Sequence, residues 1–372
     1  MRGKFYNKDV NVYQAAKKRM AYIFDNFEKI IVSLSGGKDS TILTHLALEE
    51  AKERNRKVYC FFLDQEFEYN STILHVEELM KHPNVIPLWF QIHGILPTAI
   101  SHDEYWLEPW NPDEKNKWLR AQKRVGIKQI TWDHNVQYSF PNEKKFGFYG
   151  LIKVMEQMFK EPVAQLVGLR AEESLDRFRA VVNNPALPDI PWSTKGNKGN
   201  VKFYPIYDWT FSDIWVYAGK NKISYNKIYN YFWKKGGSVR DMRVSSLMNR
   251  KAFSCLAELQ EFDPYLYDKL LDRTQGIKTA SEYANRDQIF KVKKLPSKFK
   301  TWLEYRNFLL ATLPNQEHAQ IFRDRFKKQL LNEYVHKQQV FQIQIHDITN
   351  SKKIINKEDP EKERKFQWLK DL

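Results

Sequence analysis

The stretch from residue 30 to residue 46, IIVSLSGGKDSTILTHL, constrains the fold of this chain more than any other feature. An apolar β-branched run precedes a short loop rich in serine and glycine, and an amphipathic helical pattern begins at Thr41. The adjacent Gly36 and Gly37 permit backbone angles at which consecutive N–H groups converge on an anion, and Lys38 adds a mobile positive charge. The hydroxyl donors of this segment are Ser33, Ser35 and Ser40. The segment therefore predicts a strand, a phosphate-binding loop and a helix in direct succession.

The pattern around this loop predicts a doubly wound α/β fold. Strands are expected at 29–34, 57–63, 84–92, 162–167 and 202–206. Helical patterns separate the first three, and this β-α-β-α-β alternation is typical of a mainly parallel sheet, here of five strands. Ligands of such sheets bind beyond the carboxyl ends of the strands, where Ser35 and Asp64 both lie.

A second candidate site lies at 168–177, GLRAEESLDR, directly after a predicted buried strand. Its side chains would therefore emerge at the same edge of the sheet as the loop. Arg170 and Arg177 could hold phosphate or sulfate oxygens in a bidentate manner, with Glu173 fixing one guanidinium group. The alternative is a solvated helix start with an ordinary ion pair between Glu173 and Arg177, and spacing by itself favours this alternative.

Four segments between residues 30 and 217 resemble the PP-loop superfamily of adenine nucleotide α-hydrolase-like proteins. The loop has that superfamily's SGGxDS form, and its spacing fits neither a Walker A loop nor a dinucleotide-binding loop. The run at 168–177 resembles the G-x-R-x-x-E-S-x-x-R motif of the phosphoadenosine phosphosulfate (PAPS) reductase branch. Residues 203–215, FYPIYDWTFSDIW, resemble its P-L-x-x-W-x-x-x-D-V-W segment, and residues 63–68 loosely resemble its D-T-G-x-x-F-x-E segment. A glycine-rich turn that only links a strand to a helix is the alternative interpretation of the loop.

This resemblance implies that the chain binds ATP by its β,γ-pyrophosphate and cleaves it between the α- and β-phosphates. The implied nucleotide-binding residues are Ser33, Ser35, Gly36, Gly37, Lys38, Asp39, Ser40, Phe62, Asp64, Gly168, Arg170 and Glu173. The implied catalytic residues are Lys38, Asp39, Arg170 and Arg177. Lys38 and the loop amides would stabilise the departing charge, both arginines would orient the acceptor or the α-phosphate, and main-chain groups near Phe62 would hold the adenine.

Magnesium brought in with ATP is the expected metal, because Mg²⁺ usually keeps water and phosphate ligands. Its candidate carboxylate ligands are Asp39 and Asp64. For Asp39, an equally weighted alternative is a helix-start residue that the helix dipole stabilises. The histidines and the two cysteines form no zinc-binding pattern and are too few for an iron–sulfur cluster, so we expect neither zinc nor such a cluster.

The chain departs from PAPS reductases after Trp215. It has neither their C-terminal cysteine, in an E-C-G-x-H-type sequence, nor the paired cysteines of adenosine phosphosulfate (APS) reductases. Cys255 stands among apolar helical neighbours and is predicted to be a buried core thiol. Attack on sulfate sulfur then has no nucleophile, so PAPS reduction by this chain is not expected. Binding or reduction of PAPS or APS with an external thiol is one alternative function.

The C-terminal part resembles the domain of unknown function DUF3440. We expect a nucleotide-binding α/β domain at 1–220, with an insertion or lid at 101–147, and a basic, mainly helical domain at 221–372. PAPS-reductase-like proteins with such a domain resemble the immunoglobulin-binding regulator A group, which is found in phages and bacteria beside ParB-like partners. The resemblance suggests a ParB-like protein partner and, as a second alternative function, a nucleotide-sensing regulator without turnover.

A net charge of +15 and a pI of about 9.4 favour polyanionic partners. Residues 286–372 alone carry 19 Lys and Arg against 11 Asp and Glu. Nucleic acid is therefore a candidate partner, and a general solubility trait is an equally weighted alternative. The mean hydropathy is −0.63, no apolar run approaches a membrane span, and residues 1–20 lack a secretory signal pattern. We therefore expect a cytoplasmic protein that does not associate with membranes.

Overall fold

The computed structural model divides the chain into two compact units. The first unit is Met1–Leu96 with Glu108–Leu247, and the second is Pro97–Leu107 with Met248–Leu372. Within these units the structure describes residues 10–98, 106–122, 129–130, 150, 152, 155–156, 158–182, 185–187, 189–197, 199–236, 242, 244, 246–248, 253–278, 294–348, 350 and 353–355.

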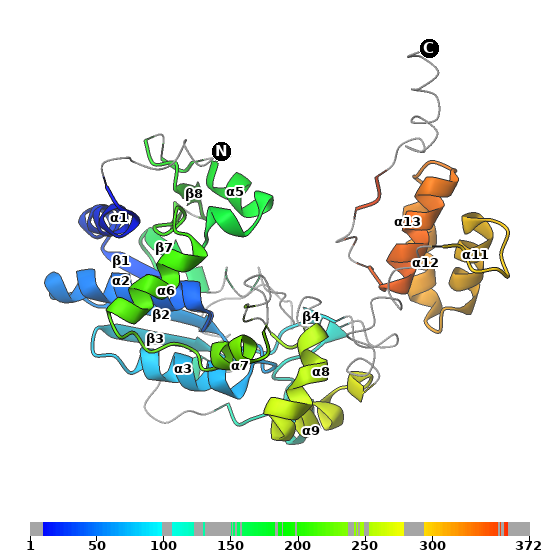
Figure 1. Ribbon diagram of the computed structural model, residues 1–372, viewed down its shortest axis with the longest axis horizontal. Coiled ribbons are helices and arrows are strands. Elements are labelled where there is room, and N and C mark those ends of the chain that lie inside the picture. The colour runs from blue at the N-terminus through cyan, green and yellow to red at the C-terminus, as the bar shows by residue number, and fades with distance from the viewer. Residues whose placement is uncertain are drawn as a thin grey trace, which may run out of the picture. The chain divides into compact units, whose positions relative to one another are not determined.

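A seven-stranded sheet with the order β6-β3-β2-β1-β7-β9-β8 forms the centre of the first unit (Figure 1). Its strands are β1 (Lys29–Ser33), β2 (Val58–Leu63), β3 (Val85–Phe90), β6 (Gln129–Ile130), β7 (Val163–Val167), β8 (Ser193–Lys195) and β9 (Val201–Phe203). All neighbouring strands are parallel except β8 and β9, which are antiparallel. Two further short strands lie outside this sheet, β4 (Leu96–Pro97) and β5 (Trp106–Leu107).

The predicted doubly wound, mainly parallel α/β fold is confirmed, but the predicted number of five strands is wrong. The two strands of this sheet that the sequence did not indicate are β6 and β8, which have two and three residues. A strand this short contains too few residues to show the alternation or the apolar run by which strands are recognised.

Alternate residues of the strands pack into different cores, as the pleat of a sheet requires. Ile30 and Val32 belong to one core, and Ile31 belongs to another together with Met155. The helices that contribute to the first core are α1 (Val12–Asn26), α2 (Lys38–Glu53), α3 (Asn70–Met80) and α6 (Phe211–Lys220). Because the central strands are covered on both faces, their sequences are nearly continuous apolar runs.

Side-chain caps determine where several of these helices begin. The Asn11 side chain accepts the Gln14 N–H at 2.9 Å before α1, and Thr210 and Asp213 form the corresponding capping box before α6. The helix α3 begins at Asn70, and its N-cap is Tyr69, which makes no side-chain cap bond.

The described part of the second unit is mainly helical, as expected. Its helices are α8 (Phe253–Phe262), α9 (Pro264–Arg273), α11 (Trp302–Thr312), α12 (Gln316–Phe326) and α13 (Glu333–Gln344). The last three share a core made of Leu310, Leu313, Ala319, Phe322, Phe326 and Ile343. Across the described segments of both units, none of the helices combines the length and the apolar character needed to cross a membrane.

The carboxyl end of β7 and the start of α2 pack backbone against backbone at Gly168. A Cβ atom on Gly168 would lie 3.0 Å from both the carbonyl carbon of Asp39 and the nitrogen of Ser40. Real Cβ atoms essentially never come closer than this, and backbone atoms cannot move away as a flexible side chain can. A glycine at this position therefore allows β7 and α2 to meet.

We expect Gly168→Ala to lower the free energy of unfolding by about 1–3 kcal/mol, because the added methyl group overpacks this contact. Gly219→Ala in α6 is the matched control, since a Cβ there meets no atom within 4 Å. That control should be neutral or more stable by about 0.5–1 kcal/mol. Denaturant titration measures both changes, and equal stability of the two variants would contradict the close approach.

Candidate functional site

The SGGKDS loop follows the carboxyl end of β1 and leads directly into α2 (Figure 1). Gly36 has a φ of +72°, and a Cβ there would lie 2.6 Å from Thr72 Cγ2, so the loop requires glycine at this position. Gly37 is the N-cap of α2 and has no side chain with which to cap the first N–H groups of the helix. The start of α2 is therefore open to polar groups from elsewhere.

The predicted serines of the loop have different roles. The hydroxyl oxygens of Ser35 and Ser40 lie 3.0 Å apart, the Ser35 N–H donates to Ser40 Oγ at 3.1 Å, and Ser40 Oγ donates to the Gly37 carbonyl at 3.0 Å. These bonds fix the loop against the first turn of α2. Ser33 lies in β1, where its hydroxyl accepts from Gln165 Nε2 of β7 at 2.9 Å.

Two buried cations flank Asp39 at the start of α2. Lys38 Nζ lies 2.9 Å from Asp39 Oδ2, and Arg170 Nε donates to Asp39 Oδ1 at 2.6 Å. Lys38 is 5 % exposed and Arg170 is 4 % exposed, so water screens their charges little. The structure therefore brings the loop and the 168–177 segment together, although more than a hundred residues separate them in the sequence.

Carboxylates surround the remaining guanidinium nitrogens of Arg170. Nη1 lies 3.2 Å from Glu172 Oε2, and Nη2 lies 3.5 Å from Glu173 Oε1. The other oxygen of Glu173 is 2.5 Å from Nη1 of Arg177, which lies four residues later in α5 (Leu175–Val182) and is half-exposed. Arg170 thus belongs to the loop site, whereas Arg177 makes the ion pair that ordinary helical spacing predicts.

Asp64 is the centre of a second buried cluster. Its Oδ1 accepts from the Arg120 guanidinium and from the Glu66 N–H at 3.0 Å. Its Oδ2 accepts from Trp89 Nε1 at 2.9 Å and from Gln91 Nε2 at 2.8 Å. Each oxygen of Asp64 thus accepts from two protein donors, whereas each oxygen of Asp39 has one cationic partner, which makes Asp64 the weaker of the two predicted magnesium ligands.

Phe62 and the possible metal ligands are the remaining parts of the predicted site. Phe62 is buried in β2 and pairs with Trp89 of β3, and the two rings meet edge to face at 5.1 Å. Its main chain therefore lies near the carboxyl end of β2, where the adenine contact was expected. Within the described residues, no group of three or more His, Cys, Asp or Glu side chains could hold a metal ion.

Sequence analysis missed the residues from 226 to 229 that contact the loop. Tyr229, in α7 (Ile228–Lys234), accepts the Lys38 N–H at 2.9 Å. Asn226 Nδ2 donates to the Gly36 carbonyl at 3.0 Å and to Thr72 Oγ1 at 2.8 Å. About 190 residues separate these partners, so no local pattern connects them. The sequence marks this segment only by its many aromatic residues: residues 225–233 are YNKIYNYFW, and they follow the motif at 203–215.

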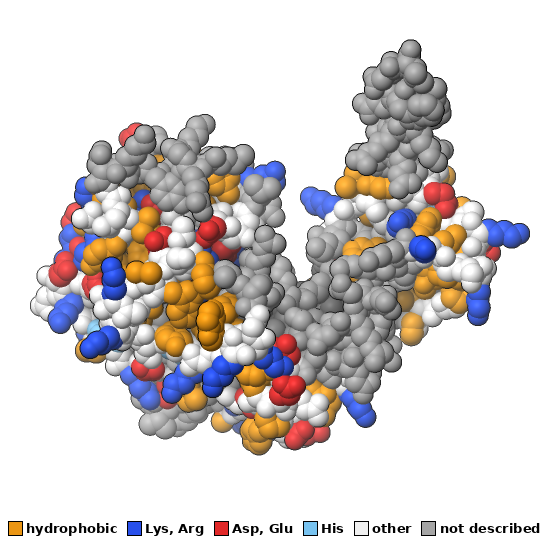
Figure 2. Space-filling model, viewed as in Figure 1, with side chains coloured by type: hydrophobic (Ala, Val, Ile, Leu, Met, Phe, Trp, Pro, Cys, Tyr) orange, Lys and Arg blue, Asp and Glu red, His pale blue; other side chains and the backbone are white. Residues whose placement is uncertain are grey.

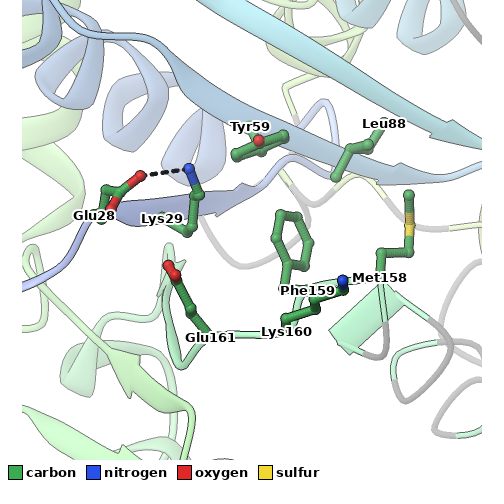
Figure 3. A pocket seen from close by; sticks show the side chains of 8 residues that line it. All are labelled: Glu28, Lys29, Tyr59, Leu88, Met158, Phe159, Lys160 and Glu161. Carbon is green, nitrogen blue, oxygen red and sulfur yellow. Dashed lines mark hydrogen bonds and ion pairs between the residues drawn. The ribbon is translucent and has the colours of Figure 1, made fainter.

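A cavity of about 350 Å³ lies at the amino ends of β1 and β2 (Figure 3). Lys29, which begins β1, forms an ion pair with Glu28 at 2.6 Å, and the rings of Tyr59 and Phe159 meet edge to face at 4.9 Å. The loop follows the opposite, carboxyl end of β1. This cavity is therefore not part of the candidate phosphate site.

Figure 2 shows hydrophobic side chains gathered over α6 and α7 on one face of the first unit. On these helices Val216 is 53 % exposed and Trp233 is 75 % exposed. Lys and Arg side chains are spread over the same face among other types (Figure 2). The positive charge that the composition leads us to expect is therefore not concentrated in one patch on this face.

Comparison with known families shows to which protein family the chain is related. The profile of the phosphoadenosine phosphosulfate reductase domain family matches residues 29–240. The chain belongs to this family. A second profile, the domain of unknown function DUF3440, matches residues 236–366. The PAPS reductase-like domain and the DUF3440 domain that the motifs led us to expect are both confirmed.

Several individual proteins resemble this PAPS-reductase-family chain. The uncharacterised protein YbdN of Escherichia coli K12 is 28 % identical over 334 residues, which is 85 % of this chain and 78 % of that protein. The PAPS reductase of Candida auris is 14 % identical, with a TM-score of 0.33, over 58 % of this chain and 84 % of that one. The FMN adenylyltransferase of Candida glabrata in complex with ATP is 13 % identical, with a TM-score of 0.35, over 61 % and 63 % of the two chains. Both structural likenesses are too weak to support an argument about function.

Glu68, next to the Asp64 cluster, is a buried carboxyl whose protonation is coupled to folding. Burial and, to a smaller extent, the neighbouring Asp64 carboxylate raise its pKa to about 8 against the opposing effect of Arg120. Its Oε1 accepts the Gln65 N–H at 3.3 Å. The side chain is therefore neutral in the folded protein at pH 7, where an exposed glutamate is charged.

We expect the stability contributed by neutral Glu68 to be complete below its ordinary pKa of 4.5 and to be lost as the pH rises toward about 8. Between these values the folded chain binds more protons than the unfolded chain, so stability falls with rising pH. Glu68→Gln keeps the shape of the neutral side chain but does not titrate. The melting temperature of this variant should therefore fall less than that of the wild type between about pH 5 and 8. Calorimetry checks this, with the exposed Glu53→Gln as control. Parallel pH profiles for the wild type and Glu68→Gln would contradict the assignment.

Proposed function

We propose that this PAPS-reductase-family chain is an ATP pyrophosphatase of the PP-loop type, which cleaves ATP between the α- and β-phosphates and adenylylates an acceptor. The observation that carries the proposal is the left-handed turn at Gly36 beside the open start of α2, with the buried cations of Lys38 and Arg170 next to it. Backbone N–H groups at the start of a helix, the positive end of that helix and two desolvated cations favour a polyphosphate over a neutral ligand.

The charges in the site support an exchange of partners on binding. Lys38 and Arg170 are both paired with Asp39, so a polyphosphate would compete with this carboxylate for the two cations. A polyphosphate carries more negative charge than one carboxylate and offers more acceptor oxygens. Because the two cations are buried, the attraction that replaces the ion pairs acts in surroundings of low dielectric constant.

The same residues have roles in the proposed reaction. An acceptor oxygen or sulfur forms a bond to the α-phosphorus and loses its proton, while the electron pair of the α–β bridge leaves with pyrophosphate. Lys38 and the loop amides would stabilise the charge on the departing pyrophosphate. Arg170 would orient the α-phosphate or the acceptor, Arg177 would act through Glu173, which pairs with both arginines, and main-chain groups near Phe62 would hold the adenine.

Magnesium fits this site through Asp39, whose carboxylate is a hard oxygen donor beside the loop. We propose Asp39 as the protein ligand, because Mg²⁺ is commonly bound by one or two carboxylates together with phosphate oxygens and water. A bound Mg²⁺ would supply positive charge to the polyphosphate. Lys38 and Arg170 would act on the phosphate oxygens independently of the metal.

The thiol in the described part of the chain does not suit sulfonucleotide reduction. Cys60 is fully buried in β2, and burial raises the pKa of its thiol to about 12, so almost no thiolate is present at neutral pH. The prediction that Cys255 is a buried core thiol lies outside the described side chains. The family match nevertheless favours PAPS or APS as a competing ligand, to be reduced with an external thiol.

We expect the chain to release pyrophosphate from α-labelled ATP and to transfer the label to an acceptor. Lys38→Ala should lower this rate by about 10²–10³-fold, because it removes a charge that stabilises the departing group. Lys52→Ala is the matched control, since Lys52 is exposed in the last turn of the same helix. Thin-layer separation of labelled products and a coupled pyrophosphate assay measure both quantities.

Three results would count against adenylyl transfer. Release of orthophosphate alone would show cleavage at a different bond. Strong competition by PAPS, with turnover that depends on an added thiol carrier, would favour the sulfonucleotide function. Nucleotide binding without any turnover, abolished by Lys38→Ala, would favour a nucleotide-sensing regulator.

We further propose that the partner or acceptor is a nucleic acid, on the basis of the net charge of +15. If six to ten phosphate contacts are made, affinity for a short labelled RNA or DNA should fall by about 10³–10⁵ between 50 and 200 mM salt. Fluorescence anisotropy at several salt concentrations measures this slope. Binding that does not depend on salt, or no binding at low salt, would contradict the proposal.

A further inference from the structure

Tyr229 of α7 brings its hydroxyl group to the N-terminus of α2. The oxygen accepts the Lys38 N–H at 2.9 Å and lies 3.5 Å from the position that a Cβ of Gly37 would occupy. The side chain is 3 % exposed, and burial raises the pKa of the phenol, with a smaller contribution from the negative charge of Asp39. The hydroxyl group is therefore protonated at neutral pH and lies directly beside the loop.

The hydroxyl of Tyr229 has hydrogen-bonding capacity that the described residues do not use. A phenol carries one proton and two oxygen lone pairs. One lone pair accepts the Lys38 N–H, and in the described part of the chain no group accepts the phenolic proton. A buried donor without an acceptor is unfavourable, so this position favours a ligand that brings acceptor oxygens.

Neighbouring side chains hold the ring of Tyr229 in place. Trp215 meets it edge to face with the ring centroids 5.4 Å apart, and Phe232 does so at 6.3 Å. Asn226, three residues earlier, bonds the Gly36 carbonyl and Thr72 Oγ1 and so ties this segment to the loop. The hydroxyl is thus positioned without a ligand, which lowers the entropy that ordering would lose on binding.

We propose that Tyr229 is a phosphate-binding residue of this site, whose hydroxyl accepts the Lys38 N–H and donates its proton to an oxygen of a polyphosphate held in the loop. This inference rests on the proposed function, because it assigns a further contact to the same ligand. The hydroxyl adds a neutral donor where the cations are already paired with Asp39. It therefore extends the site without adding a charge that must be buried.

Calorimetric titration of the full chain with inorganic pyrophosphate and with ATP tests the proposal. Tyr229→Phe removes the hydroxyl and keeps the ring, and its affinity for both ligands should be about tenfold weaker. Tyr225→Phe is the matched control, because the Tyr225 ring packs on the same Trp215 at 5.2 Å while its hydroxyl donates to Asn230 Oδ1. The control should bind as the wild type does. Thermal unfolding of both variants establishes that they are folded.

The possible results separate this proposal from the proposed function. Unchanged affinity in folded Tyr229→Phe overturns the role of Tyr229 while pyrophosphate binding by the wild type still supports the site. Tighter binding also overturns it, because the hydroxyl would then compete with the anion for the Lys38 N–H. If the wild type binds neither pyrophosphate nor ATP, both the proposed function and this inference are overturned.

Discussion

The buried ion pair between Arg170 and Asp39 is the interaction on which the site depends. It joins the start of α2 to the segment after β7 at a distance of 2.6 Å, and close by the two backbones meet at Gly168. A buried guanidinium without its carboxylate is strongly unfavourable, so the pair fixes both segments relative to each other. Lys38, on the other oxygen of Asp39, is held by the same arrangement.

This arrangement gives the site its charge balance before any ligand binds. The carboxylates of Asp39, Glu172 and Glu173 neutralise the two cations of the site, which would otherwise attract a phosphate without competition. A site of this kind favours ligands that carry several negative charges, because a weak anion gains little by replacing a carboxylate that is already well placed. Neutral donors gain importance for the same reason, and the Tyr229 hydroxyl beside the loop is one of them.

Much of the fold could be predicted from the sequence because its central strands are buried on both faces. The β-branched run before the loop and the run KVYCFFL at 57–63 both predict buried strands. The strands that they form, β1 and β2, are central in the sheet. The strands β6 and β8 were missed because pairing with a neighbour, and not a local pattern, makes a segment of two or three residues a strand. Asp64 is a similar case: its position after β2 was predicted, but three of its four donors are Trp89, Gln91 and Arg120, which are distant in the sequence.

The sequence by itself determined the loop, its place after β1 and the family to which the chain belongs, because these depend on residues that are adjacent along the chain. Only the tertiary structure decided that Arg170 pairs with Asp39 while Arg177 pairs with Glu173, since the spacing allows either arginine to face the loop. It also decided that Tyr229 contacts the start of α2. Contacts across more than a hundred residues form because the sheet and its helices bury their apolar faces together, and that packing leaves no short-range signal in the sequence.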